Sequence, residues 1–186
     1  MRLQSRDHQL INFIIDCPAT TFTLDKMFFD SYAYAKRRLK KLADHGHIKR
    51  TRKDINDPYV YYLGYKPNQL QHLSLVSEFY CRLEKSGGKV KRFIRERALP
   101  YSIRPDGMFL YKIRGVSYLL ALEVEISNNS SDKKIRKYEQ LYQSNELGDF
   151  PTIVYISDKN KIESDIIPVV HIKTDFSNWE EFISRL

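Results

Sequence analysis

The chain has 186 residues, of which 42% are hydrophobic, and a formal net charge of +8. This apolar content is sufficient for one or two small cores without disulfides. Cys17 and Cys81 are far apart and show neither a disulfide framework nor zinc-ligand spacing. No apolar stretch reaches the length that crosses a bilayer, and residues 1–10 lack the apolar core of a signal peptide. We therefore expect a cytoplasmic protein without a membrane partner.

The excess positive charge is concentrated in residues 33–53. Of the 31 basic and 23 acidic residues, this segment holds nine basic ones and only Asp44 among the acidic ones, which leaves 22 of each sign elsewhere. A solvated surface usually mixes the two signs, so this concentration favours a polyanionic partner. Charge alone leaves DNA, RNA and an acidic membrane as alternatives.

Three helices are predicted at the N-terminus. Asp7 is expected to cap a helix whose apolar residues recur at helical spacing until Pro18. A short helix is predicted over residues 24–29. A third is expected to begin after residues 30–31 and to end at Gly46. Its inward stripe is formed by Tyr32, Ala35, Leu39 and Leu42, and its solvent face by Tyr34, Arg37, Arg38 and Lys41.

A β-hairpin is predicted after the third helix, with strands at 48–53 and 59–63 and a turn at 56–58. Three helices and a hairpin are the order of a winged helix-turn-helix, whose third helix enters the major groove of DNA. We therefore predict double-stranded DNA as the partner, and a homodimer is an open alternative. Near the bases we place Ser31, Tyr34, Arg37 and Arg38, and near the phosphates Lys41, Lys49, Arg50, Arg52 and Lys53.

The rest of the chain is predicted to form a second, mixed-sheet domain. Residues 64–68 contain a glycine and a proline, and we divide the chain there into domains 1–66 and 67–186. The predicted elements are a helix at 69–85, strands at 89–99, 107–113 and 117–126, a helix at 132–147, strands at 151–157 and 169–173, and a helix at 179–186. The fold class is therefore α+β, with a winged helix-turn-helix followed by an α-β-β-β-α-β domain.

Three carboxylates are expected to lie together in this second domain. Glu123 and Glu125 are two apart on a strand and share a face. An antiparallel hairpin through residues 114–115 places Asp106 beside them. Mg²⁺ and Mn²⁺ favour such oxygen ligands and activate water for attack on phosphate, so either ion is the predicted cofactor. Otherwise no cofactor is predicted.

The Pro105-Asp106 pair, the Glu123-Val124-Glu125 triplet and this element order resemble the PD-(D/E)XK nuclease superfamily. The resemblance implies that Asp106 and Glu123 are metal ligands. The place of Glu125 is usually taken by a lysine that orients the attacking water. Some restriction endonucleases carry glutamate there, and other members supply the lysine from the following helix, where Lys134 and Lys137 lie.

A wider pattern resembles the replication-relaxation family of plasmids and mobile elements. It comprises the winged helix, His72-Leu73 at the start of a helix, the turn Arg104–Gly107, the strand residues Leu122–Glu125 and the basic segment Lys134–Tyr138. The resemblance implies a DNA-binding protein of a plasmid, phage or integrative element. It also implies action in replication, DNA relaxation or transfer, with replication or relaxase proteins as further partners.

The alternatives differ in the role of the second domain. An active endonuclease uses Asp106, Glu123 and Glu125 as catalytic metal ligands, with Lys134 or Lys137 facing the phosphate charge. A transcriptional regulator or protein-docking module instead carries an inactive nuclease-like domain. In that case Asp106 only initiates a turn, and the glutamates pair with nearby cations on a solvated sheet face, namely Arg95, Arg97 or Lys134.

Overall fold

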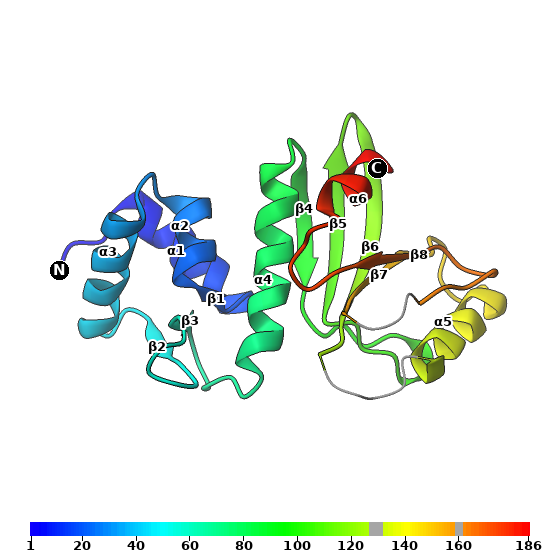
Figure 1. The fold of residues 1–186 in the computed structure, drawn as a ribbon, viewed down its shortest axis with the longest axis horizontal. Coiled ribbons are helices and arrows are strands. Elements are labelled where there is room, and N and C mark those ends of the chain that lie inside the picture. The colour runs from blue at the N-terminus through cyan, green and yellow to red at the C-terminus, as the bar shows by residue number, and fades with distance from the viewer. Residues whose placement is uncertain (127–131, 159–161) are drawn as a thin grey trace. The chain divides into compact units, whose positions relative to one another are not determined.

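The protein divides into two compact units, Met1–Arg82 and Leu83–Leu186. The computed structural model describes residues 1–126, 132–158 and 162–186, and each unit has a sheet of its own (Figure 1). The division falls inside helix α4, Leu70–Lys85, whereas the predicted boundary precedes that helix. Within the described ranges, no helix combines the length and apolar character needed to span a bilayer.

The first unit packs three helices on a small sheet. The helices are α1 (Ser5–Asp16), α2 (Thr21–Phe28) and α3 (Tyr32–Asp44). The strands β1 (Ala19–Thr20), β2 (Lys49–Thr51) and β3 (Val60–Tyr62) are antiparallel in the order β1-β3-β2. Their common core includes Leu10, Ile14, Leu24, Leu39, Leu42, Ile48 and Tyr61. The strand β1 was not predicted, because its two residues are defined only by pairing with the distant β3.

Local details of these helices differ from the sequence prediction. Asp7 is not the cap of α1 but its third residue, and its Oδ2 accepts a hydrogen bond of 2.7 Å from the backbone N–H of the cap Gln4. The helix α2 begins three residues earlier than predicted because Thr20 caps it, accepting from the N–H of Thr23 at 3.2 Å. Tyr32 is 50% exposed, so the prediction that it joins the inward stripe of α3 is wrong.

The second unit is built on a five-stranded mixed sheet in the order β4-β5-β6-β7-β8. The first three strands are antiparallel, whereas β6, β7 and β8 are parallel. Their bounds are β4 Lys89–Ile94, β5 Gly107–Ile113, β6 Val116–Val124, β7 Thr152–Ile156 and β8 Val169–Ile172. The predicted chain order α-β-β-β-α-β, with a further strand and helix, is the order found.

Helix α5 (Asp132–Ser144) connects the parallel strands β6 and β7 and packs on one face of the sheet. Its buried residues Tyr138 and Leu141 share a core cluster with Ala121 of β6 and Ile153 of β7. Side chains two apart on a strand share a face, so Glu123 lies on the same side as Ala121. The short helix α6 (Trp179–Ser184) closes the chain, and a 3-10 helix (Pro100–Ser102) precedes β5. The strand β4 ends at Ile94, earlier than predicted.

Candidate functional site

The pairing of β5 with β6 brings Asp106 beside the end of β6. Gly107 is opposite Leu122, and the backbone N–H of Asp106 donates to the carbonyl of Leu122 at 2.9 Å. The Asp106 carboxylate in turn accepts from the backbone N–H of Val124 at 2.7 Å. The prediction that the hairpin places Asp106 next to the glutamate-bearing end of the neighbouring strand is therefore confirmed.

Glu123 is buried beneath α5, with 1% of its surface exposed. The Tyr138 hydroxyl donates a hydrogen bond of 2.6 Å to Oε1, and the Lys134 ammonium forms an ion pair with Oε2. Lys137 is exposed, so Lys134 is the lysine of α5 that reaches this carboxylate. The predicted pairing of a glutamate with Lys134 is confirmed, but it lies on a buried sheet face and not on a solvated one.

The protonation of Glu123 is controlled by its surroundings. Burial raises the pKa of its carboxyl group from 4.5 to about 7. The Lys134 charge acts in the opposite direction, whereas the charge of Asp106 adds to the increase. Burial and the Glu123 charge also raise the pKa of Tyr138, so its phenol remains a hydrogen-bond donor. The contact of Tyr138 with Glu123 is not evident from the sequence.

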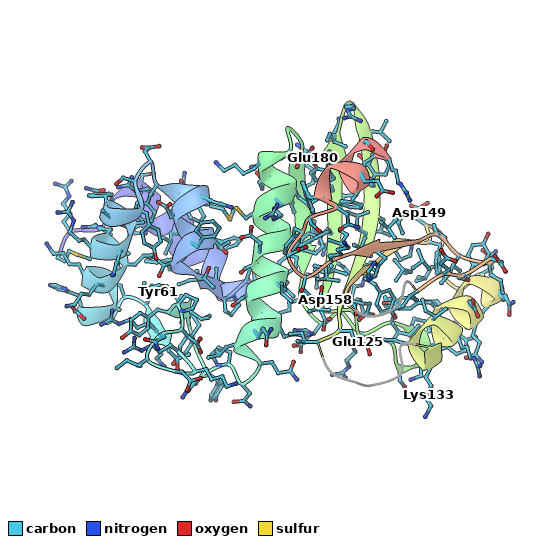
Figure 2. All side chains as sticks on the ribbon, in the orientation of Figure 1. Tyr61, Glu125, Lys133, Asp149, Asp158 and Glu180 are labelled. Atoms are coloured by element: carbon cyan, nitrogen blue, oxygen red, sulfur yellow. The ribbon has the colours of Figure 1, made fainter. Side chains whose placement is uncertain are left out.

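Glu125 and Tyr155 complete the surroundings of this cluster. Glu125 lies just beyond β6, where its backbone N–H donates to the carbonyl of Ile156 at 2.9 Å. Figure 2 shows Glu125 and Asp158 where the parallel strands β6 and β7 end. Tyr155 pairs with Glu123 in register, and its buried hydroxyl has no hydrogen-bond partner within the described ranges. Burial, followed by the charges of the three carboxylates, raises the pKa of Tyr155.

The described residues show no assembled group of ligands at the predicted Mg²⁺ or Mn²⁺ site. Within residues 1–126, 132–158 and 162–186, no three His, Cys, Asp or Glu side chains are placed to hold a metal ion. Both oxygens of Glu123 contact Lys134 and Tyr138, and one oxygen of Asp106 contacts the backbone. A hard cation requires several oxygen ligands, so we assign no chemical step to a metal ion.

The first unit presents exposed cations on α3 and on the segment that follows it, from β2 to residue 53. We define the α3 basic surface as the exposed residues Lys36, Arg37, Lys41, Lys49 and Lys53. In the part of the chain that the structure describes, the side chains of Lys36, Arg37, Lys41 and Lys53 form no hydrogen bond or ion pair. The Lys49 ammonium donates to the carbonyl of Gly64 at 2.8 Å. Ser31, at the start of α3, is also exposed.

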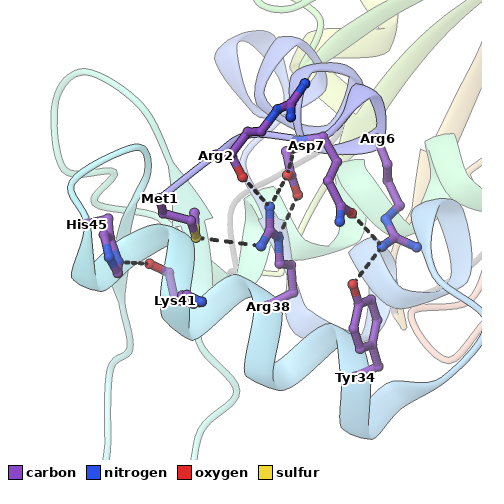
Figure 3. Close-up of polar contacts among 9 residues, drawn as sticks. Met1, Arg2, Arg6, Asp7, Tyr34, Arg38, Lys41 and His45 are labelled. Atoms are coloured by element: carbon purple, nitrogen blue, oxygen red, sulfur yellow. Dashed lines mark hydrogen bonds and ion pairs between the residues drawn. The ribbon is translucent and has the colours of Figure 1, made fainter.

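Arg38 faces the protein and not solvent, so its predicted exposure is wrong. Its Nε donates to Oδ1 of Asp7 at 3.0 Å and a terminal nitrogen pairs with Oδ2, while Asp7 itself is fully buried (Figure 3). Tyr34 is partly buried, and its hydroxyl accepts a hydrogen bond of 3.0 Å from Arg6. Arg38 and Tyr34 therefore connect α3 to α1 through Asp7 and Arg6. The periodicity of the sequence did not predict these contacts.

Two arginines of the hairpin are also engaged within the first unit. Arg50 and Arg52 lie over the ring of Tyr59, with their guanidinium carbons 4.6 Å and 4.7 Å from its centroid. Arg50 also pairs with Asp44 at 3.5 Å. Both remain partly exposed. Such stacking fixes the guanidinium planes beside the strand while leaving edges open to solvent.

Comparisons with protein-family models, with curated proteins and with solved structures each found no match for this chain.

Proposed function

We propose that this chain binds double-stranded DNA through the α3 basic surface of a winged helix-turn-helix. The observation that carries the proposal is the set of exposed cations on α3 that have no partner in the described residues, chiefly Lys36, Arg37 and Lys41. Fold stability does not account for them, because clustered like charges repel one another. A DNA phosphate backbone supplies the missing counter-charge.

The order of elements supports the same proposal. Three helices followed by the β2–β3 hairpin are the elements of a winged helix-turn-helix, in which the third helix enters the major groove. On this docking, Ser31 and Arg37 are nearest to the bases, and Lys41, Lys49 and Lys53 are nearest to the phosphates. Arg38 is excluded from this surface by its contact with Asp7.

We further propose that the second unit is a PD-(D/E)XK-like domain that does not cleave DNA. The order α-β-β-β-α-β and the adjacency of Asp106 to the end of β6 support the domain type. Lys134 and Tyr138 each contact one oxygen of Glu123, so both oxygens already have partners in this arrangement, which supports the absence of cleavage. With both units, the chain suits a replication-relaxation role in a plasmid, phage or integrative element.

DNA binding is tested by charge reversal on α3. We expect Arg37→Glu with Lys41→Glu to weaken binding to a short duplex in fluorescence anisotropy. We also expect it to reduce the slope of log K against log salt by about 0.9 for each lost phosphate contact. The control reverses two exposed cations of α5, Lys133→Glu with Arg136→Glu, and leaves the slope unchanged. A flat salt dependence in the wild-type protein contradicts the proposal.

Cleavage is tested on supercoiled, linear and single-stranded DNA in the presence of Mg²⁺ or Mn²⁺. We expect the wild-type protein and Glu123→Ala to leave all three substrates intact. Cleavage by the wild-type protein that is lost in Glu123→Ala would establish the alternative, an active endonuclease. Duplex binding without cleavage leaves a docking or regulatory role for the second unit.

A further inference from the structure

The second unit carries its own concentration of positive charge. Residues 89–114 contain eight lysine and arginine residues against two acidic ones, Glu96 and Asp106. All eight cations are exposed. The balanced charge of the chain outside residues 33–53 hides this excess, because acidic residues elsewhere cancel it. We define the β4–β5 basic surface as Lys89, Arg92 and Lys112, which the strand register places on one face of the sheet.

Strand register places the centre of this surface on one open part of the sheet. Arg92 of β4 is opposite Leu110 of β5. Two residues further along β4, Ile94 is opposite Met108, and Met108 packs in the core beneath α5. Arg92 and Leu110 therefore project from the face that α5 covers. Lys112 shares that face, two residues beyond Leu110. Leu110 is 38% exposed, and Figure 1 shows α5 away from the β5–β6 turn. Helix α5 therefore does not cover this part of the sheet.

The cations on this face lack matching negative charges. Lys89 pairs with Glu84 at 2.9 Å, but the described residues provide no ion pair for Arg92 or Lys112. Lys89 is also directly opposite Lys112, and like charges in register destabilise a sheet. Cations on an edge strand such as β4 prevent pairing between molecules. That role does not explain Lys112, because β5 is an interior strand.

We propose that the β4–β5 basic surface contacts the sugar-phosphate backbone of nucleic acid without reading its sequence. Bases in single strands are held mainly by stacking on aromatic rings. Here the aromatic pairs Phe93–Phe109 and Tyr111–Tyr118 lie on the opposite face of the sheet, as their register shows. The open face therefore offers cations and aliphatic groups, which suit phosphates and sugars and not stacked bases.

This inference goes beyond the proposed function, because it concerns the second unit and does not require contact by α3. It gives that unit a role in holding DNA that needs no cleavage. With both surfaces engaged, the salt dependence of binding reflects two groups of phosphate contacts, one for each unit.

The test compares charge reversals in the full chain. For Arg92→Glu with Lys112→Glu, we expect the slope of log K against log salt for a short duplex to fall by about 1.8, or about 0.9 per contact. The same reduction is expected in the Arg37→Glu, Lys41→Glu background. An unchanged slope in the first case overturns this inference. If Arg37→Glu with Lys41→Glu leaves the slope unchanged while Arg92→Glu with Lys112→Glu reduces it, the proposed function fails and this inference stands.

Three further measurements complete the test. Arg92→Gln with Lys112→Gln removes the charges without introducing acidic groups, so it is expected to fold and still to reduce the slope. Lys133→Glu with Arg136→Glu is the matched control and is expected to leave it unchanged. Reduced binding to phosphatidylserine vesicles with unchanged duplex binding would assign the surface to a membrane and overturn the inference.

Discussion

Each unit contains a buried carboxylate that pairs with a cation, Asp7 in the first and Glu123 in the second, and their pKa values are shifted in opposite directions. Asp7 and Glu123 are 0% and 1% exposed. Burial raises the pKa of Asp7, but hydrogen bonds from Arg38 and Gln4 outweigh burial, so the net pKa is lowered. Burial also raises the pKa of Glu123, and there the Lys134 ammonium does not compensate, so the pKa remains near 7. The direction of each shift in pKa therefore depends on the balance between burial of the carboxyl group and the hydrogen bonds and charges that it receives.

The partners of the two carboxylates contribute to this difference in pKa. The guanidinium of Arg38 contacts both oxygens of Asp7, and its side chain is only 11% exposed. Lys134 contacts one oxygen of Glu123, and its side chain is 39% exposed. The nearby charge of Asp106 repels the ionised carboxylate of Glu123. A planar guanidinium matches a carboxylate at two points, whereas an ammonium acts as a point charge. The first pair therefore suits a structural role, and the second resembles the titratable groups of functional sites.

The largest expected effect comes from breaking the Asp7 pair. We predict that Arg38→Met lowers the free energy of unfolding by about 3–5 kcal/mol, because it leaves a buried carboxylate without its cation. Chemical denaturation of the full chain at neutral pH measures the change. The neighbouring exposed Arg37→Met is the control and should remain within about 0.5 kcal/mol of the wild type. Equal effects of both variants would show that Asp7 is not stabilised by Arg38.

A pH series separates the two carboxylates. The folded pKa of Glu123 exceeds its ordinary value, so the native state retains a proton that the unfolded state releases between pH 4.5 and about 7. The contribution of Glu123 to stability therefore decreases as pH rises through that window. Asp7 has the opposite sign: its contribution is present above the unfolded pKa and is lost as pH falls through the lowered folded pKa.

Glu123→Gln removes the titration of Glu123 and leaves that of Asp7. We predict that the unfolding free energy of this variant, relative to the wild type, increases by up to about 3 kcal/mol across the window, at about 1.4 kcal/mol per pKa unit. Denaturation of both proteins at pH 4.5, 6 and 8 measures the difference. A difference that is constant with pH would contradict the raised pKa.

The smallest expected effect comes from removing the lysine. We predict that Lys134→Met costs about 1–3 kcal/mol at pH 8, where Glu123 is ionised, because one of its hydrogen-bond donors is lost. The cost should be smaller at pH 5, where the carboxyl group is protonated in the folded protein. Lys133→Met, an exposed neighbour, is the control and should change stability little at either pH. A cost that does not depend on pH would show that Lys134 acts through packing alone.

Much of the acidic cluster was predictable because its geometry is local. Asp106 and Glu123 are joined by a hairpin whose turn, Arg114-Gly115, is readable in sequence, so their adjacency follows from strand register. The contact with Lys134 was one of several alternatives. Tyr155 was not found, because it approaches Glu123 only through the parallel β6–β7 pairing. Parallel strands are joined by a long crossover, whose register sequence patterns do not specify.

The sequence by itself determined the order of the α-helices and of the strands other than β1. It also determined the concentration of charge in residues 33–53, since periodicity, turns and composition are local properties. Only the tertiary structure decided which charged side chains form ion pairs within the protein and which remain exposed. It directs Arg38 to Asp7 and Lys134 to Glu123, and it gathers Arg92 and Lys112 on an open sheet face. Each of these outcomes depends on packing between segments distant in sequence, and a count of charges along the chain contains no information about that packing.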